Sequence, residues 1–295
     1  MKRFAAFIMT YERPQEVLRM IAKLFDQSYP PEKILVVDNS ASVHTQEAIG
    51  VLNDPRIEYL RTGYNAGPAG AAGIGLKKLA ADGFSWIFWG DDNDPPKLND
   101  DFRRLLALAD EHKPGIIGAV GHHFNRRTGT IVRLPSSQLK GLLDVDTVAG
   151  GDCMIINAEA VKMGIVPDEK LFFGFEEFDF CYRVKRAGFR ILVDGDLFYE
   201  YRRVTGNLDK KRPLIAMKSN ETALKREYYS KRNLIYIFRK NGMVLPLMVL
   251  LAKSMLRGLF GFRYGLSFGI KNLRFLVLSM TDGSLSRMGK TLDLR

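Results

Sequence analysis

Short apolar runs alternate with amphipathic segments through the first half of the chain. Residues 4–9, 33–38 and 85–89 have the length and composition of buried strands, and residues 14–25 carry apolar side chains at helical spacing. Strands that alternate with helices in this way predict a parallel sheet covered by helices. We therefore expect an α/β fold over residues 1–217, with a Rossmann-like, mixed but mainly parallel sheet.

The pattern continues beyond these elements. A strand is predicted at 190–193, followed by a loop that contains Glu200, Arg202 and Arg203. A helix is then expected over about 219–240. This helix opens a C-terminal helical extension, so we place a boundary between the α/β domain and the extension at residues 217 and 218.

Residues 218–295 are both apolar and strongly basic. They hold 15 basic and 4 acidic residues and so carry the whole net charge of +11. The apolar run at 243–252 is shorter than the roughly twenty residues that span a bilayer, and beyond it Lys and Arg alternate with Leu and Phe. Such amphipathic helices lie in the interface of an anionic membrane, although packing on the protein itself or in a homo-oligomer is the alternative. We predict a membrane-associating region and no nucleic-acid binding.

The remaining composition excludes several classes of protein. The two cysteines, Cys153 and Cys181, have apolar neighbours and no C-x-x-C spacing, so we expect reduced core thiols. The four histidines lack the spacing of a zinc site. The N-terminal apolar run is too short for a signal peptide, which favours a catalytic part on the cytoplasmic side.

An acidic cluster directly follows one of the predicted strands. Asp91, Asp92, Asn93 and Asp94 precede Pro95, and closely spaced carboxylates near a core need a cation or protons to offset their charge. A hard divalent ion held by one or two carboxylates and by substrate phosphates meets that need. The cluster predicts Mg²⁺ or Mn²⁺ carrying a diphosphate, with a solvated turn as the alternative.

Polar residues also end the first two predicted strands. Thr10 and Asp38 stand at strand ends, where parallel sheets bind nucleotides, although Asp38 also suits a turn and a cap. The glycine-rich residues 64–73 enter a helix, and this arrangement favours either a phosphate or close helix packing. Together these features predict a nucleotide-diphosphate site at one edge of the sheet.

Two adjacent carboxylates precede a predicted helix in the second half. Glu176 and Glu177 follow an aromatic loop, where burial and like charge would raise one pKa toward the range of a general base. The alternative is an acidic helix start favoured by the helix dipole, which we apply to Asp179 in any case.

Taken in order, these motifs resemble those of inverting family 2 glycosyltransferases with the GT-A fold. The resemblance is strongest to the bacterial rhamnosyltransferase and galactofuranosyltransferase branch. The matching segments are residues 10–14, 37–40, 65–70, 89–96, 150–152, 173–183, 228–233 and 281–290.

The resemblance implies a peripheral enzyme on the cytoplasmic face of a bacterial membrane. It would move rhamnose, galactofuranose or another hexose from a UDP- or dTDP-sugar to a lipid-linked cell-surface glycan, such as O-antigen, capsule or wall polysaccharide. Residues 1–96 would bind the donor and residues 97–217 the acceptor. Glu177, with Glu176 beside it, would be the general base.

The resemblance also implies the remaining site residues. The donor-binding residues would be Thr10, Tyr11, Arg13, Asp38, Asn65, Gly67, Asp91 and Asp92. The acceptor-binding residues would be Gly151, Asp152, Arg202 and Arg203. The ligands of Mn²⁺ or Mg²⁺ would be Asp92, Asp94 and Glu200, with Asp91 and Asn93 as alternatives in register.

One position departs from the family pattern. Many relatives have a metal-binding histidine after the final strand, whereas residues 197–203 of this chain contain none, and Glu200 is the candidate substitute. A carboxylate oxygen also suits Mg²⁺ or Mn²⁺. The departure nevertheless leaves open a non-catalytic nucleotide-sugar-binding scaffold subunit of a polysaccharide-assembly complex, and a nucleotidyltransferase is a third interpretation.

Overall fold

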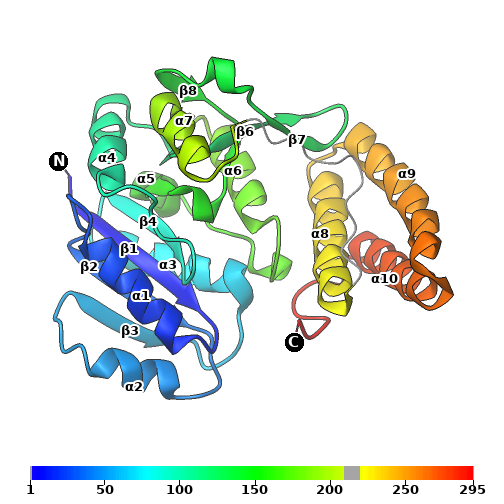
Figure 1. Cartoon of the computed structure of the whole chain (residues 1–295), viewed down its shortest axis with the longest axis horizontal. Coiled ribbons are helices and arrows are strands. Elements are labelled where there is room, and N and C mark those ends of the chain that lie inside the picture. Colours follow the sequence, from blue (N-terminus) through cyan, green and yellow to red (C-terminus); the bar gives the residue numbers. More distant parts are fainter. Residues whose placement is uncertain (1, 209–219, 295) are drawn as a thin grey trace. The chain divides into compact units, whose positions relative to one another are not determined.

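The computed structural model describes residues 2–208 and 220–294 (Figure 1). These residues form two compact units. The first comprises residues 2–123, 133–169 and 177–208, and the second comprises 124–132, 170–176 and 220–294. The predicted boundary at 217 and 218 lies outside the described residues.

The first unit is built on an eight-stranded sheet. Its order is β3-β2-β1-β4-β10-β5-β11-β8. The bounds are β1 Phe4–Thr10, β2 Lys33–Asp38, β3 Ile57–Arg61, β4 Trp86–Asp91, β5 Ile116–Gly118, β8 Leu142–Asp144, β10 Ile155–Asn157 and β11 Ile191–Asp194. Pairs β1–β2, β1–β4, β2–β3 and β5–β11 are parallel, whereas β10 and β8 run antiparallel to their neighbours. The mixed, mainly parallel sheet confirms the predicted fold class.

Helices flank this sheet, and a smaller sheet accompanies it. The α-helices are α1 Pro14–Phe25, α2 His44–Gly50, α3 Gly67–Ala81, α4 Asp101–His112, α5 Ala158–Lys162, α6 Glu176–Arg186 and α7 Gly195–Val204. The short 3-10 turns are η1 Ser136–Gln138, η2 Gly150–Asp152 and η3 Glu169–Leu171. The smaller sheet contains β6 Gly121–Asn125, β7 Thr130–Arg133 and β9 Thr147–Val148.

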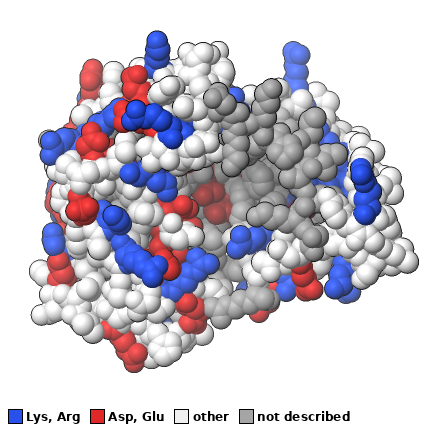
Figure 2. Space-filling view, viewed as in Figure 1, with Lys and Arg blue, Asp and Glu red and all other residues white. Residues whose placement is uncertain are grey.

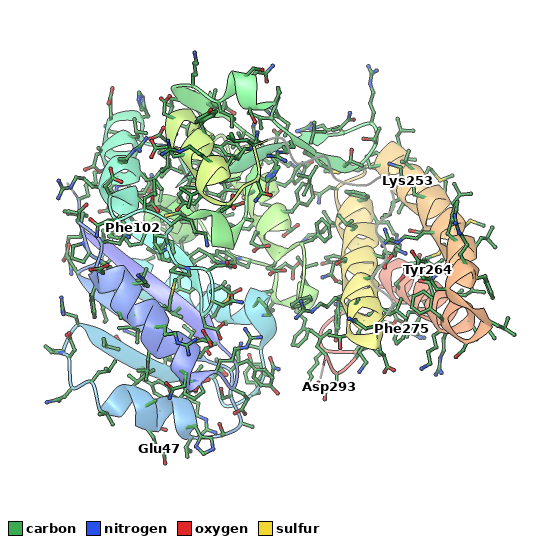
Figure 3. The ribbon with its side chains drawn as sticks, in the orientation of Figure 1. Glu47, Phe102, Lys253, Tyr264, Phe275 and Asp293 are labelled. Atoms are coloured by element: carbon green, nitrogen blue, oxygen red, sulfur yellow. The ribbon has the colours of Figure 1, made fainter. Side chains whose placement is uncertain are left out.

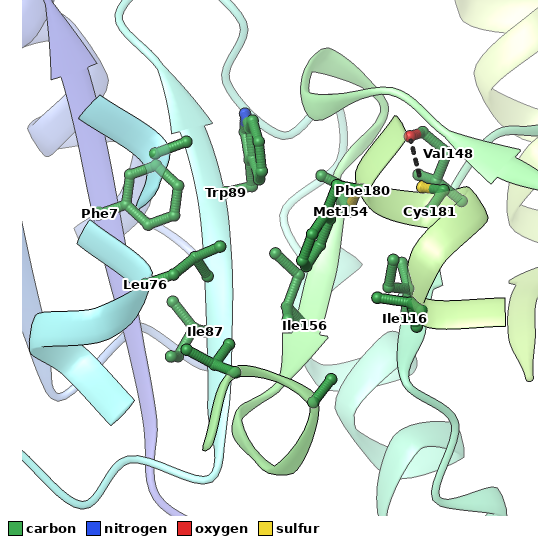
Figure 4. Close-up of a cluster of buried hydrophobic side chains, with 14 of the residues drawn as sticks. Phe7, Leu76, Ile87, Trp89, Ile116, Val148, Met154, Ile156, Phe180 and Cys181 are labelled. Carbon is green, nitrogen blue, oxygen red and sulfur yellow. Dashed lines mark hydrogen bonds between the residues drawn. The ribbon is translucent and has the colours of Figure 1, made fainter. Parts of the chain in front are cut away.

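Both faces of the sheet are covered. The central strand β1 shows this, since each of its residues is buried. Alternate side chains enter two separate cores, with Phe4 in one and Phe7 in the other. In the core shown in Figure 4, Phe7 packs beside Trp89 with ring centroids 5.7 Å apart. The same core contains Cys181, and both cysteines are buried and free, as expected. These cores fix the strand ends that carry the polar cluster.

Helix α3 fits this core because of its small residues. A Cβ at Gly75 would lie 2.6 Å from Phe7 Cγ, so only glycine allows the helix to approach the strand this closely. The helix also begins at Gly67, earlier than the residue pattern predicted. Close packing therefore accounts for Gly75, just beyond the glycine-rich residues 64–73.

The expected loop around Glu200 is wrong, because these residues form helix α7. The Asp194 side chain accepts hydrogen bonds from the backbone N–H groups of Asp196 and Leu197 and so caps the helix. Leu197 and Tyr201 then bury one face of it. The helical spacing separates Glu200 from Arg202 and gives the two side chains different surroundings.

The second unit consists mainly of helices α8 Glu221–Lys240, α9 Val244–Phe260 and α10 Leu266–Leu285, with the turn η4 Gly261–Tyr264. The Asn220 side chain accepts a hydrogen bond from Ala223 N and caps α8. A Cβ at Gly283 would lie 2.8 Å from the Arg232 carbonyl oxygen, so glycine lets α10 lie close against α8. This unit contains the predicted C-terminal helical extension.

Helix α9 is longer than the apolar run that predicted it. Helix α9 continues into η4, and together Val244–Tyr264 has 21 residues, a mean hydropathy of 1.6 and 22% of its most apolar window buried. By length and composition this longer segment is able to cross a membrane, whereas residues 243–252 alone are too short. The same composition is compatible with a helix that lies on a membrane surface.

Candidate active site

The ends of β1, β2 and β4 bring the predicted donor residues together. Thr10 pairs with Asp38 in the β1–β2 register, and Met9 pairs with Asp91 in the β1–β4 register. Thr10 Oγ1 donates a hydrogen bond of 2.8 Å to Asp92 Oδ2. One edge of the sheet therefore presents the end of the first strand beside the acidic cluster, as the residue pattern predicted.

Asp38 is fully buried and fixes the turn that follows β2. Its Oδ1 accepts a hydrogen bond from Ser40 N, and its Oδ2 accepts one of 2.8 Å from the Tyr59 hydroxyl. Burial and this hydrogen bond raise the pKa of Tyr59. Both carboxylate oxygens of Asp38 therefore support the turn and cap that was the alternative interpretation of this residue.

The sequence pattern did not identify Glu12 as part of this edge of the sheet. Glu12 has a positive φ of 57°, and its carboxylate accepts hydrogen bonds from Ala41 N and from both Ser42 N and Oγ. Glu12 thereby ties the loop after β1 to the loop after β2. Its position inside the 10–14 motif was the available signal, but a backbone-binding role could not be read from the residue type.

The glycine-rich segment adjoins the same loops. Asn65 Oδ1 accepts a hydrogen bond from Gly67 N, and Asn39 bonds both Ala66 N and the Gly67 carbonyl. Gly67 has a φ of +68°, a conformation that favours glycine at the start of α3. Asn65 and Gly67 therefore lie beside the turn that Asp38 organises, while the nearby Tyr11 is half-buried.

Negative charge accumulates after β4. Burial, together with the charges of Asp92, Asp94 and Glu177, raises the pKa of Asp91 to about 6. Asp92 is buried, and its Oδ1 lies 3.2 Å from Arg13 Nη1. Burial also raises the pKa of Asp92, against the opposing effects of Thr10 and Arg13. These carboxylates repel one another unless a cation or proton joins them.

The carboxylate of Glu177 lies close to this cluster. Its Oε1 accepts a hydrogen bond of 3.4 Å from Gly150 N at the first residue of η2. Burial raises the pKa of Glu177, and the charge of Asp94 adds to the effect. Two glycines allow η2 to lie this close to Trp89 and Asp94. A Cβ at Gly150 would lie 2.6 Å from the Trp89 ring, and one at Gly151 would lie 2.7 Å from Asp94 Oδ2.

The other acidic residues near Glu177 have different surroundings. Glu176 is buried at the first position of α6. Asp179 is also buried and accepts a hydrogen bond of 2.7 Å from Arg183 Nε one turn later, which agrees with a structural role. Asp152, predicted beside Gly151, is half-buried in η2.

Glu200 does not join the predicted metal ligands. Its Oε1 pairs with Arg104 Nη1 at 3.0 Å, and Arg104 also pairs with Asp194. Among residues 2–208 and 220–294, no group of three His, Cys, Asp or Glu side chains is arranged to hold a metal ion. The three-ligand set with Asp92 and Asp94 is therefore not assembled, because helix α7 presents Glu200 to Arg104 on α4.

Arg202 and Arg203 differ sharply in their surroundings. Arg203 is exposed, whereas Arg202 is only 5% exposed. The Arg202 guanidinium donates to Ser136 Oγ at 3.1 Å and lies 4.4 Å from the centroid of the Phe198 ring. Burial and the charge of Arg133 lower the pKa of Arg202 to about 10. Among residues 2–208 and 220–294, no carboxylate is described in an ion pair with Arg202.

Comparison with known proteins identifies the family of this chain. Residues 5–161, more than half of the chain, match the family model described as glycosyl transferase family 2. The chain belongs to glycosyl transferase family 2. This family 2 chain is 24% identical over 196 residues to galactofuranosyltransferase GlfT1 of Mycobacterium tuberculosis, covering 62% of this chain and 64% of the relative. It is also 24% identical over 201 residues to GlfT1 of Mycolicibacterium smegmatis, covering 62% and 65%.

Solved structures show the same GT-A fold. The complex of TarS 1–349 of S. aureus with UDP superposes with a TM-score of 0.52 and 15% identity, covering 97% of this chain and 91% of that one. The mannosyltransferase PcManGT of Pyrobaculum calidifontis, in complex with GDP-Man and Mn²⁺, gives a TM-score of 0.51 and 13% identity, covering 97% and 88%. GalNAc-T7 with UDP, GalNAc and Mn²⁺ gives 0.58 and 13%, covering 81% of this chain and 48% of that one.

Proposed function

We propose that this family 2 glycosyltransferase is an inverting enzyme that uses a UDP- or dTDP-sugar and extends a lipid-linked cell-surface glycan. The sugar would be rhamnose, galactofuranose or another hexose. The observation that carries the proposal is the placement of Glu177, partly buried with a raised pKa, beside the carboxylates that follow β4. A base and a diphosphate site in proximity are what sugar transfer from a nucleotide donor requires.

The donor would bind along the ends of β1, β2 and β4. Thr10, Tyr11 and Arg13 follow the first strand, and the buried Asp38 turn and the start of α3 at Asn65 and Gly67 adjoin it. Parallel sheets bind nucleotides at this edge. The UDP and GDP-Man found in the TarS and PcManGT structures support a nucleotide donor for this chain.

A divalent cation fits the acidic cluster. Asp91, Asp92 and Asp94 supply hard oxygen atoms. The pKa of Asp91 is raised first by burial and then by the neighbouring carboxylates, and a cation would offset the negative charge of all three. Mg²⁺ needs only one or two carboxylates when water and phosphate complete its shell, so Glu200 is not required. The Mn²⁺ in the GalNAc-T7 and PcManGT complexes supports this assignment. A bound cation would stabilise the charge that develops on the departing nucleoside diphosphate.

The chain's own residues would perform the remaining chemistry. Glu177 would accept the proton of the acceptor hydroxyl, whose oxygen attacks the anomeric carbon from the face opposite the leaving group. The C–O bond to the diphosphate breaks, and the configuration inverts. Gly150 N holds the Glu177 carboxylate in place. The neighbouring Gly151 and Asp152 would line the acceptor side of the site.

Arg202 supports a phosphate-bearing acceptor. Arg202 is only 5% exposed, and a buried guanidinium is stabilised by a bound anion. The phosphate of a lipid-linked glycan would supply that anion, with Ser136 holding the guanidinium in place. Arg203, which is exposed, would contribute only long-range attraction.

The second unit supports attachment to an anionic membrane. Many large apolar side chains of its helices are exposed, among them Val244, Leu245, Met248, Met255, Leu256, Leu259, Leu266, Ile270, Leu273 and Val277. In Figure 2 the surface over α9 is mainly uncharged with scattered Lys and Arg, and Figure 3 shows Lys253 and Tyr264 there. Apolar surface flanked by basic residues suits the head-group region of anionic lipids. We place the enzyme on the cytoplasmic face of the bacterial membrane.

The variant Glu177→Gln tests the proposal against a non-catalytic scaffold. The observation that favours the scaffold is the ion pair between Glu200 and Arg104, because Glu200 was the expected third metal ligand. An enzyme should lose sugar transfer in E177Q by roughly 10²–10⁴-fold while its affinity for UDP or dTDP changes little. A scaffold would bind donor with no transfer in either form. Release of pyrophosphate instead of a nucleoside diphosphate would indicate a nucleotidyltransferase.

A further inference from the structure

The segment that leads into Glu177 has an unusual backbone conformation. Phe172, Gly174 and Phe175 have positive φ values of 59°, 85° and 66°, immediately before α6 begins at Glu176. Two of these residues carry side chains that disfavour this region. Such conformations persist only where the surrounding structure over-determines them.

A buried asparagine of helix α8 holds these residues in their conformation through hydrogen bonds. Asn233 is fully buried, and the two hydrogens of its Nδ2 are shared among the carbonyl oxygens of Leu171, Phe173 and Gly174 at 2.9, 3.0 and 2.7 Å. One side chain therefore holds three carbonyl groups within four residues. The Phe172 ring packs against Tyr229, one turn earlier on the helix.

Arg232 lies next to Asn233 and uses all five of its donor hydrogens in hydrogen bonds to Asn233, to residue 171 and to the C-terminal residues 289 and 291. Its Nε and Nη2 donate to Asn233 Oδ1, which orients the amide, and Nη2 also donates to the Leu171 carbonyl. Its Nη1 donates to the Gly289 carbonyl and to Thr291 Oγ1. Arg232 is fully buried, so each of these bonds meets a need that water does not satisfy.

The C-terminal segment closes the network. Gly289 N donates to the Lys170 carbonyl at 2.7 Å, directly before the strained residues. The Tyr229 hydroxyl donates to the Leu292 carbonyl and accepts from Thr291 N and Leu292 N. Residues 170–174 are thus bonded from α8 and from residues 289–292, both within the second unit.

We infer that Asn233, oriented by Arg232, is a positioning residue for Glu177. It fixes the backbone up to Gly174, and only two residues separate that point from Glu177. A base must be held within a fraction of an ångström of its working position, and misplacement by about 1 Å costs roughly 10²-fold in rate. This inference rests on the proposed function, because Glu177 is the base of that reaction.

The experiment compares Asn233→Ala with Asn272→Ala in the full-length protein bound to vesicles. Asn272 is a matched control, because it is 3% exposed and donates to two carbonyl groups, of Arg257 and Gly258, away from residues 170–174. N233A should increase amide exchange over residues 171–178 and lower kcat roughly 10–100-fold, with the affinity for UDP unchanged. N272A should lower thermal stability without either effect.

A double variant separates positioning from general loss of structure. If Asn233 acts through Glu177, N233A should not slow the residual transfer of E177Q any further, whereas N272A should leave kcat unchanged in both backgrounds. Thr291→Val, which removes one Arg232 acceptor, gives a milder variant should N233A not fold, with a smaller change in the same direction.

Three results would overturn the inference. They are unchanged exchange over 171–178 in N233A, increased exchange with unchanged kcat, or equal losses of kcat in N233A and N272A. A wild-type protein that binds donor but transfers no sugar would instead overturn the proposed function, and this inference with it.

Discussion

Thr10 and Asp92 are joined by a hydrogen bond of 2.8 Å across 82 residues of sequence. The bond links the end of β1 to the first residue after β4, beside the loop that would receive the donor. Because Asp92 is buried, its negative charge depends on this bond and on Arg13 for stabilisation.

Thr10→Val removes the hydrogen bond and keeps the shape of the side chain. We expect a loss of about 1–3 kcal/mol in the free energy of unfolding, measured by urea denaturation, because a buried carboxylate loses a donor. Thr45→Val is the matched control, since Thr45 is buried and the structure describes no hydrogen-bond partner for its hydroxyl. T45V should leave stability unchanged or slightly raised. Equal losses in both variants would contradict the prediction.

The raised pKa of Glu177 predicts a pH-dependent stability. The folded state binds this proton more tightly than the unfolded state, so the contribution is complete below the ordinary glutamate pKa of about 4.3 and is lost as the pH rises through the folded value. Glutamine does not ionise, so Glu177→Gln removes this loss of stability at high pH. The melting temperature of E177Q, measured in EDTA, should exceed that of the wild type at pH 8, and the difference should shrink toward pH 4. A difference independent of pH would be inconsistent with a buried base.

Gly151→Ala tests the approach of Asp94 to η2. Its Cβ would lie 2.7 Å from Asp94 Oδ2, so the carboxylate must move away. We expect roughly tenfold or greater loss in affinity for Mn²⁺ with UDP, measured by calorimetry. Gly50→Ala is the control, since nothing lies within 4 Å of its Cβ, and it should stabilise α2 by about 0.5–1 kcal/mol. Unchanged affinity in G151A would remove Asp94 from the site.

Arg202→Met exchanges a buried charge for an apolar side chain of similar length. The free energy of unfolding should stay the same or rise, because the desolvated charge is removed. The KM for a phosphate-linked acceptor should nevertheless rise by about tenfold or more, since hydrogen bonds to charged groups are worth about 1.5–3 kcal/mol. Arg203→Met, at an exposed position, should change neither quantity appreciably. A lower stability with unchanged KM would assign Arg202 to structure alone.

The exposed face of α9 predicts that membrane binding depends on both apolar contact and charge. Leu256→Asp combined with Leu259→Asp places charges at positions that are 59% and 67% exposed, and should abolish flotation with vesicles that contain anionic lipid. High salt should weaken wild-type binding. Val51→Asp, which is 85% exposed in the first unit, should leave flotation unchanged. Binding that survives both the double variant and salt would exclude this attachment.

The sequence determined the sheet and the edge at which we propose the site. The apolar runs of β1, β2 and β4 are readable because a strand buried on both faces must be apolar at every position. Parallel strands then bring their polar ends together whatever the details of packing, which is why Thr10 and Asp92 could be placed at one site.

Tertiary structure alone decided which partners the longer side chains have. Glu200 meets Arg104 across 96 residues, and Asn233 meets the Gly174 carbonyl across 59, because helices α4, α7 and α8 pack where they do. Charge and hydrogen-bonding capacity are properties of the residue, but the partner depends on which faces of distant helices become neighbours. For this reason the residue pattern identified the carboxylates and not the groups that hold them.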